Sequence, residues 1–231
     1  MQGLGFRIQT QNIDNNLQKA KNFMSQGRYS KAAKEYESAA ESLSTPDFVK
    51  NILPTMKQLR RNNQYEGSML QNDLHNLSKY KGELYSKASN MYTLKANNLF
   101  TESKNKNIDL NEQLEKNKKA IKYYEKALGT PQISKEESLN LMDKLSVSYN
   151  RQYLLLNKKT PTPNDEQKKE IKNYLAKVIQ MNTLLDNSTD NKTKYKDRNR
   201  AAINKMLNLC VDNPKEYDMY VLELSKIEYN L

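Results

Sequence analysis

The chain has 231 residues, 36% of them hydrophobic, and its 38 basic and 27 acidic residues give a formal net charge of +11. The mean hydropathy of -0.97 excludes a thick globular core and favours a thin, elongated one, and no apolar run is long enough to span a membrane. The single cysteine, Cys210, excludes a disulfide framework within one chain and a thiolate metal cluster, and its helical spacing from Met206 favours a buried thiol.

Glycine and proline each occur six times, nearly always at the ends of apolar-periodic segments. This distribution is typical of long helices joined by short turns. Because apolar β-branched residues seldom alternate with polar ones, strands are not expected. The sequence therefore predicts an all-α chain of about nine helices.

Residues 1–12 are polar and are expected to form a flexible N-terminus. They hold one arginine and no apolar stretch of signal-peptide length, which predicts an intracellular, cytoplasmic protein. Residues 13–231 are expected to form a single α-helical domain.

The domain is expected to begin with two helices, over residues 14–25 and 30–42. Gly27 separates them, and the Ser30 hydroxyl is expected to cap the second. A third helix is predicted over residues 44–59, with a kink or break at Pro54.

A long helix is predicted over residues 68–100, where leucine, alanine and methionine follow a near-heptad spacing. Gly82 is the place where it is expected to bend or split. The next helix, residues 111–128, carries a stripe of alternating small and large side chains, among them Ala120, Tyr124 and Ala127, with lysines on the other faces.

Capping signals place the remaining helices. Gly129 is expected to end the preceding helix in a left-handed conformation. Ser134 with Glu137, and Asn164 with Gln167, form capping boxes for helices over residues 134–156 and 164–185. Residues 186–191 are expected to be a loop, followed by a helix ending at Leu209 and a last helix capped at Asn213.

Two of these helices share one pattern. Ala32, Tyr36 and Ala39 repeat the spacing of Ala120, Tyr124 and Ala127, and Gly27 and Tyr29 supply a Gly-x-Tyr turn before the first copy. This pattern resembles the second helix of the tetratricopeptide repeat (TPR). The resemblance is best over residues 13–43 and 89–131. It implies a TPR-like, right-handed stack of antiparallel helix hairpins, and a non-enzymatic scaffold or adaptor that binds a peptide or helix of a protein partner in its groove.

The resemblance also implies that ligand contacts come from the inner faces of the first helices of each pair. These partner-binding positions are Leu17, Lys21, Met24, Thr93, Asn97, Phe100, Lys144, Val147 and Arg151. Chaperone-binding members of the family clamp a C-terminal carboxylate with a lysine and an asparagine on the first helix. Leu17 and Lys21 stand at those positions here, which argues against such a clamp.

Catalytic chemistry has little support in the sequence. His75 is the only histidine, so a histidine-based triad or a multi-histidine metal site cannot form within one chain. The acidic pairs at residues 136–137 and 165–166 lie in first turns of helices, where they complement the helix dipole. We therefore expect no catalytic residue, no cofactor and no metal.

The basic excess leaves alternatives open. Residues 192–200, KTKYKDRNR, concentrate positive charge and are a possible site for nucleic acid or for an anionic membrane surface. An acidic peptide or an amphipathic helix suits the same charge without new architecture. The first three helices also resemble the microtubule-interacting and trafficking (MIT) domain, a second adaptor hypothesis. The sequence carries no signal for an oligomeric state.

Overall fold

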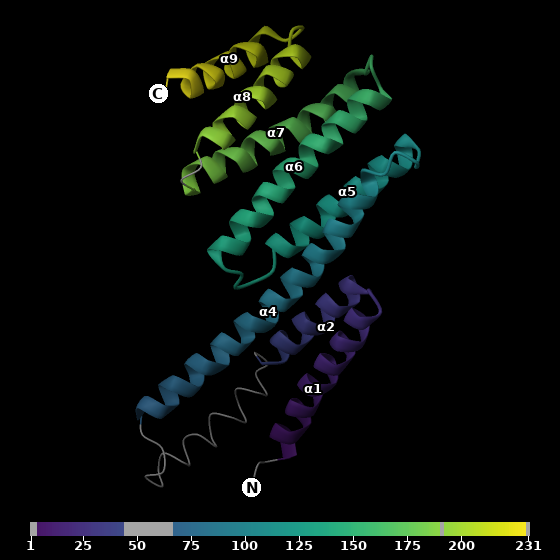
Figure 1. Cartoon of the computed structure of the whole chain (residues 1–231). Coiled ribbons are helices and arrows are strands. Elements are labelled where there is room, and N and C mark those ends of the chain that lie inside the picture. The colour runs from purple at the N-terminus through teal and green to yellow at the C-terminus, as the bar shows by residue number, and fades with distance from the viewer. Residues whose placement is uncertain (1–3, 44–66, 190–191, 230–231) are drawn as a thin grey trace. The chain divides into compact units, whose positions relative to one another are not determined.

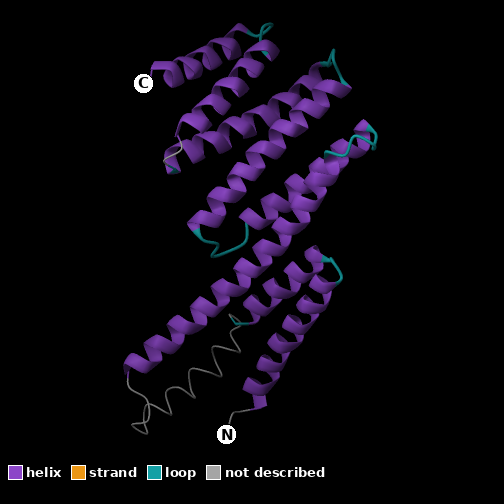
Figure 2. Cartoon of the chain, viewed as in Figure 1, coloured by secondary structure: helices purple, strands orange, loops and turns teal. Residues whose placement is uncertain are grey.

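The computed structural model describes residues 4–43, 67–189 and 192–229. These residues form eight helices and no strand, so the all-α prediction is confirmed for them (Figure 2). The helices, labelled in Figure 1, are α1 (Leu4–Ser25), α2 (Tyr29–Ser42), α4 (Gly67–Ser103), α5 (Leu110–Leu128), α6 (Lys135–Lys159), α7 (Asp165–Ser188), α8 (Lys192–Leu209) and α9 (Pro214–Tyr229). The helix predicted over residues 44–59 lies outside the described residues.

Contacts group the chain into two compact units, which are described separately. Unit 1 comprises Met1–Lys95 and Lys126–Ser134, and unit 2 comprises Ala96–Glu125 and Lys135–Leu231. The helices α4 and α5 each contribute a segment to both units. A single domain over residues 13–231 stays a prediction.

Unit 1 is packed around small side chains on α1, α2 and the first part of α4. The fully buried alanines on these helices are Ala20, Ala32, Ala33, Ala39, Ala40 and Ala88, and Ala127 of α5 is also fully buried in this unit. Alanine lets helix axes approach closely, because the side chain ends at the β-carbon. Tyr36 is buried beside them, and the Tyr92 hydroxyl donates to a Glu37 carboxylate oxygen at 2.8 Å, which ties α4 to α2.

Two predicted helix starts in unit 1 are corrected. α1 begins at Leu4, about three turns before residue 14. No proline interrupts residues 4–13, so the helix continues through them. α2 begins at Tyr29, its N-cap is Arg28 without a side-chain cap, and Ser30 lies inside the first turn.

The turn between α1 and α2 depends on Gly27, whose φ is +68°. This left-handed conformation lets the Arg28 amide donate to the Phe23 carbonyl at 2.8 Å and close the end of α1. The expected glycine break is therefore confirmed.

α4 runs without a break through Gly82. A β-carbon at Gly82 would lie 3.4 Å from the Gln132 side-chain oxygen, at the edge of ordinary van der Waals contact, and the expected break at this glycine is not present. In the turn after α5, the positive φ is at Gln132, +58°, and not at the predicted Gly129.

The core of unit 2 consists of large aliphatic side chains from α6, α7 and α8. The most deeply buried are Leu145, Ile171, Leu175, Leu185, Ile203 and Met206. Consecutive helices from α6 to α9 pack on one another. Tyr124 and Tyr149 are buried in the same unit, and Cys210 is buried as expected.

The predicted capping box of α7 is confirmed. The Gln167 amide donates to Asn164 Oδ1 at 2.9 Å, and the Asn164 amide donates to Gln167 Oε1 at 3.0 Å. The loop predicted from residue 186 was placed too early, because α7 continues to Ser188.

Candidate functional site

The nine predicted partner-binding residues fall into both units. Leu17, Lys21, Met24 and Thr93 belong to unit 1, and Asn97, Phe100, Lys144, Val147 and Arg151 belong to unit 2. In unit 1, Lys21 and Met24 are exposed on α1. The Thr93 hydroxyl donates to the Ser89 carbonyl one turn earlier at 2.9 Å, so it serves its own helix.

In unit 2, α6 contacts the end of α4 through predicted residues. Asn97 Oδ1 accepts a hydrogen bond from the Tyr124 hydroxyl at 2.7 Å and a longer one from Lys144 Nζ at 3.5 Å. Arg151 Nε donates to Ser103 Oγ at 2.9 Å, and its guanidinium also donates to the Ser103 carbonyl. The structure thus brings Asn97 and Lys144 together.

Arg151 and Phe100 are engaged within the protein. The Arg151 guanidinium binds the last carbonyl of α4, where the helix dipole favours a cation. Burial lowers the pKa of Arg151 below its ordinary value. The Lys104 ammonium lies 4.1 Å from the centre of the Phe100 ring. These contacts stabilise the end of α4. The Arg151 and Phe100 side chains are therefore not freely available to a partner.

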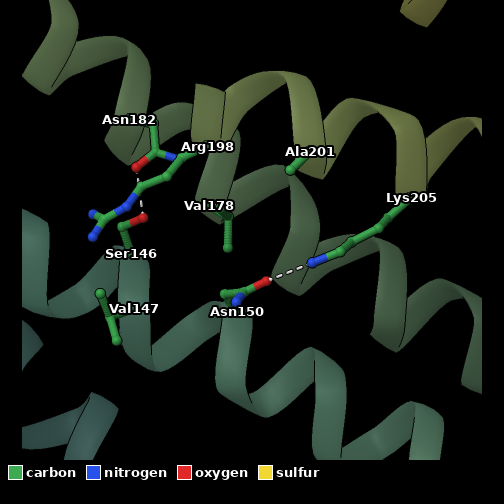
Figure 3. Close-up of a pocket in the computed structure, with 8 residues that line it drawn as sticks. All are labelled: Ser146, Val147, Asn150, Val178, Asn182, Arg198, Ala201 and Lys205. Atoms are coloured by element: carbon green, nitrogen blue, oxygen red, sulfur yellow. Dashed lines mark hydrogen bonds between the residues drawn. The ribbon is translucent and has the colours of Figure 1, made fainter. Parts of the chain in front are cut away.

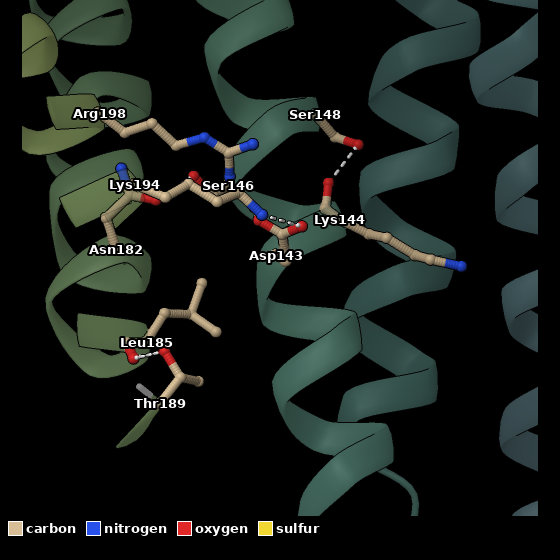
Figure 4. Close-up of polar contacts among 9 residues, drawn as sticks. All are labelled: Asp143, Lys144, Ser146, Ser148, Asn182, Leu185, Thr189, Lys194 and Arg198. Atoms are coloured by element: carbon tan, nitrogen blue, oxygen red, sulfur yellow. Dashed lines mark hydrogen bonds and ion pairs between the residues drawn. The ribbon is translucent and has the colours of Figure 1, made fainter. Parts of the chain in front are cut away.

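A second set of contacts joins α6 to α8. Asp143 pairs with Lys194 at 3.3 Å and with Arg198. Figure 4 shows Asp143 directed toward these two cations, whereas Lys144 extends from the other side of α6. About two turns of α8 after Arg198, Lys205 Nζ donates to Asn150 Oδ1 at 3.0 Å and lies 5.0 Å from the centre of the Tyr153 ring.

A pocket of about 300 Å³ lies between α6, α7 and α8 (Figure 3). Its lining residues are Ser146, Val147, Asn150, Val178, Asn182, Arg198, Ala201 and Lys205. Val147, 37% exposed, is the one predicted partner-binding residue in this wall. Five of the other seven belong to α7 or α8, whereas the implied first-helix positions stopped at α6. The remaining two, Ser146 and Asn150, lie on α6 but were not among the implied positions. The basic pattern of residues 192–200 was the available signal.

Within the described part of the chain, a hydrogen-bond donor in this pocket lacks an acceptor and a positive charge lacks a carboxylate partner. Asn182 is 0% exposed, its Oδ1 accepts from Ser146 Oγ at 2.6 Å, and its Nδ2 has no hydrogen-bond partner. Burial lowers the pKa of Lys205 below its ordinary value. Among the described residues, no carboxylate lies within ion-pair distance of Lys205. The site therefore has donors and positive charge in excess.

Ion pairs also link α7 to α5 and to α9. Lys177 and Glu125 join α7 to α5 at 3.6 Å, and Lys172 and Glu216 join α7 to α9 at 2.7 Å. Burial raises the pKa of the Cys210 thiol, beside Lys172 and Glu216. The thiol therefore belongs to the packing between α7 and α9.

The basic run at residues 192–200 is largely engaged in ion pairs. Lys194 and Arg198 share Asp143, and Arg200 pairs with Asp197 at 2.8 Å. These carboxylates reduce the positive charge that the run presents to phosphates.

Across residues 4–43, 67–189 and 192–229, no cluster of three or more His, Cys, Asp or Glu side chains has the arrangement of a metal site. The side chain of His75 lies outside the described part. None of the described helices combines the length and the hydropathy that a bilayer span requires.

No protein-family model matches the chain, and a search of curated proteins likewise finds no match.

Proposed function

We propose that the protein is a non-enzymatic adaptor that binds an acidic peptide, or an amphipathic helix bearing acidic residues, on a TPR-like face formed by the end of α4 with α6 and α8. One observation carries this proposal: in unit 2, each of these helices contacts the helix two positions along the chain. α4 meets α6 at Asn97 and Lys144, and α6 meets α8 at Asp143 and Arg198.

This contact order supports a stack of helix hairpins. In such a stack the first helices of successive pairs form one layer and the second helices form another. The ion pairs from α7 to α5 and from α7 to α9 follow the same alternation in the second layer.

The chemistry of the first layer favours an acidic partner. Lys144, Lys194, Arg198 and Lys205 lie on it, against the carboxylate of Asp143, and all four cations are only partly buried. Exposed Val147 adds an apolar contact among them. Positive charge around a partly apolar face steers and orients an acidic segment.

The experiment is a peptide-binding measurement with matched surface variants. A randomised peptide library displayed on phage is selected on the full chain, and the recovered peptides are measured by fluorescence anisotropy. We expect them to be acidic, and we expect Val147→Asp to weaken their binding by about tenfold, because it adds like charge to the contact.

Leu184→Asp is the matched control, since Leu184 is also an exposed apolar residue, at 41%, but lies on α7 outside the pocket wall. Equal losses for both variants, or selection of peptides without acidic residues, would contradict the proposal.

A further inference from the structure

We propose that the pocket between α6, α7 and α8 seats a glutamate side chain of the bound peptide, with Lys205 and Asn182 as the groups that bind its carboxylate. The inference rests on the proposed function, because it specifies the chemistry by which that face recognises a peptide.

The first argument is the unmatched donor. Asn182 Nδ2 is buried without an acceptor, whereas Oδ1 of the same amide is already bound by Ser146. A buried donor that has left water without finding an acceptor destabilises the folded chain. The Asn182 side chain lines the pocket, and no described residue accepts a hydrogen bond from its Nδ2. An acceptor oxygen that enters the pocket and reaches Nδ2 removes that penalty.

The second argument is the uncompensated cation. Lys205 reaches from α8 across the pocket to the amide oxygen of Asn150, as Figure 3 shows. An amide and an aromatic ring are its neighbours in place of a carboxylate. Half-buried ammonium groups are strongly stabilised by an opposite charge, because water screens the pair incompletely.

The third argument explains why the pocket favours a carboxylate over a phosphate. Arg198, the guanidinium in the pocket wall, is already paired with Asp143, which also holds Lys194. Phosphate recognition commonly uses bidentate arginine, and here that group is occupied. Lys205 and one amide donor match the smaller charge of a carboxylate.

The shape of the wall favours glutamate. Val147, Val178 and Ala201 supply apolar surface beside the two donors. A glutamate side chain carries two methylene groups ahead of its carboxylate, so its stem lies against the apolar wall while its charge reaches Lys205. A pocket of about 300 Å³ accommodates this side chain with water.

The test compares two fluorescein-labelled, end-blocked peptides of about twelve residues built from Gly, Ser and Leu with three Glu, or with three Gln at the same positions. Anisotropy is measured with the full chain at low and near-physiological salt. We expect the Glu peptide to bind at least about tenfold more tightly than the Gln peptide. We expect Lys205→Met to abolish most of this difference while leaving the Gln peptide unaffected.

Ala201 offers a second variant that does not disturb the core, because it is exposed on α8 one turn before Lys205. Ala201→Glu places an intramolecular carboxylate next to Lys205 and should block the Glu peptide, whereas the isosteric Ala201→Gln should not. Lys169→Met, an exposed lysine on α7 outside this pocket, controls for the loss of one positive charge.

The outcomes separate the two proposals. If both peptides bind equally and Val147→Asp weakens both, the adaptor proposal stands and the glutamate seat is wrong. If Lys205→Met and Lys169→Met weaken binding of the Glu peptide equally, the proposed glutamate site is also wrong, since the effect then reflects the overall charge of the protein. If neither peptide binds, and peptides selected from the library also fail, both proposals fall. If free N-acetylglutamate amide competes at the same concentration as the peptide, the pocket is a small-acid site and the peptide inference is overturned.

Discussion

At the scale of single residues, Arg151 shows how a predicted contact residue can belong to the fold. The repeat resemblance implied Arg151 as a partner-binding position on α6, but the end of α4 leaves carbonyls that require donors. The Ser103 carbonyl accepts a hydrogen bond from the guanidinium. The side chain that was predicted to contact a ligand is therefore engaged within the protein. A sequence pattern identifies the face of a helix, whereas it does not reveal which backbone groups will meet that face.

We predict that Arg151→Met, which keeps most of the apolar stem, lowers the free energy of unfolding by about 1.5–3 kcal/mol, the usual range for a hydrogen bond to a charged group. Urea unfolding followed by circular dichroism measures the change. Arg200→Met is the control, because Arg200 pairs at the surface with Asp197 in its own helix and should cost less than about 1 kcal/mol. Similar values for the two variants would refute the helix-end role of Arg151.

Tyr124 predicts a pH dependence of stability. Burial raises the pKa of Tyr124 from 10.0 to about 12, and its hydroxyl donates to Asn97. Burial, together with a hydrogen bond to Glu125, also raises the pKa of Tyr149. Because the folded pKa lies above the unfolded one, this stabilisation is fully present below about pH 10 and is lost as the pH rises through the folded pKa.

We therefore expect the free energy of unfolding to fall from about pH 10 upward, and Tyr124→Phe to make that fall shallower. Urea unfolding at several pH values measures it, with exposed Tyr217→Phe as the control. A slope that Tyr124→Phe leaves unchanged would show that Tyr124 does not contribute to it.

At the scale of elements, periodicity predicted the helices well and their ends less well. α5 and α7 lie close to their predicted ranges because apolar spacing and capping residues agree there, as the Asn164 and Gln167 box illustrates. α1 begins ten residues earlier than expected, since no proline interrupts residues 4–13 and capping residue types such as Thr10 and Asn12 are also tolerated inside a helix. We expected α4 to bend or split at Gly82, but a long helix held by tertiary contacts tolerates one glycine.

The candidate pocket could not be predicted from the sequence, because it depends on tertiary contacts. Ser146, Asn182 and Lys205 are far apart along the chain, and nothing in their local spacing places them together. Only the packing of α6, α7 and α8 does so. Val147 is the one lining residue that the repeat resemblance had also implied as a partner-binding position.

We predict that Gly27→Ala lowers the free energy of unfolding by about 1–2 kcal/mol, because the left-handed φ of Gly27 brings an added β-carbon too close to the backbone. Nothing else lies within 4 Å of that β-carbon, so the cost comes from the backbone. Thermal or urea unfolding measures it, with Gly129→Ala as the control at a glycine that lacks a positive φ. A smaller loss for Gly27→Ala than for Gly129→Ala would contradict this account of the turn.

At the scale of the whole molecule, burial is uneven along the chain. Each described side chain of α9 is exposed or half-buried, including the apolar or aromatic Tyr217 and Val221. In contrast, α7 has core residues such as Leu175 with no exposed surface. Elements with few buried contacts open at lower free energy than core elements.

Hydrogen exchange followed by mass spectrometry should therefore show α9 exchanging at least about tenfold faster than α7. Peptides covering residues 214–229 and 171–185 make the comparison within one experiment. Equal protection in the two helices would mean that α9 opens only with the rest of its unit.

The alanines that join α1, α2 and α4 have a consequence for how this protein tolerates variation. With Ala20, Ala32, Ala39 and Ala88 fully enclosed, even a single additional methyl group must displace a neighbouring backbone. A saturation mutagenesis map of unit 1 should therefore show an inverted profile, in which the smallest side chains are the least replaceable, and many large ones can be exchanged for others of similar volume.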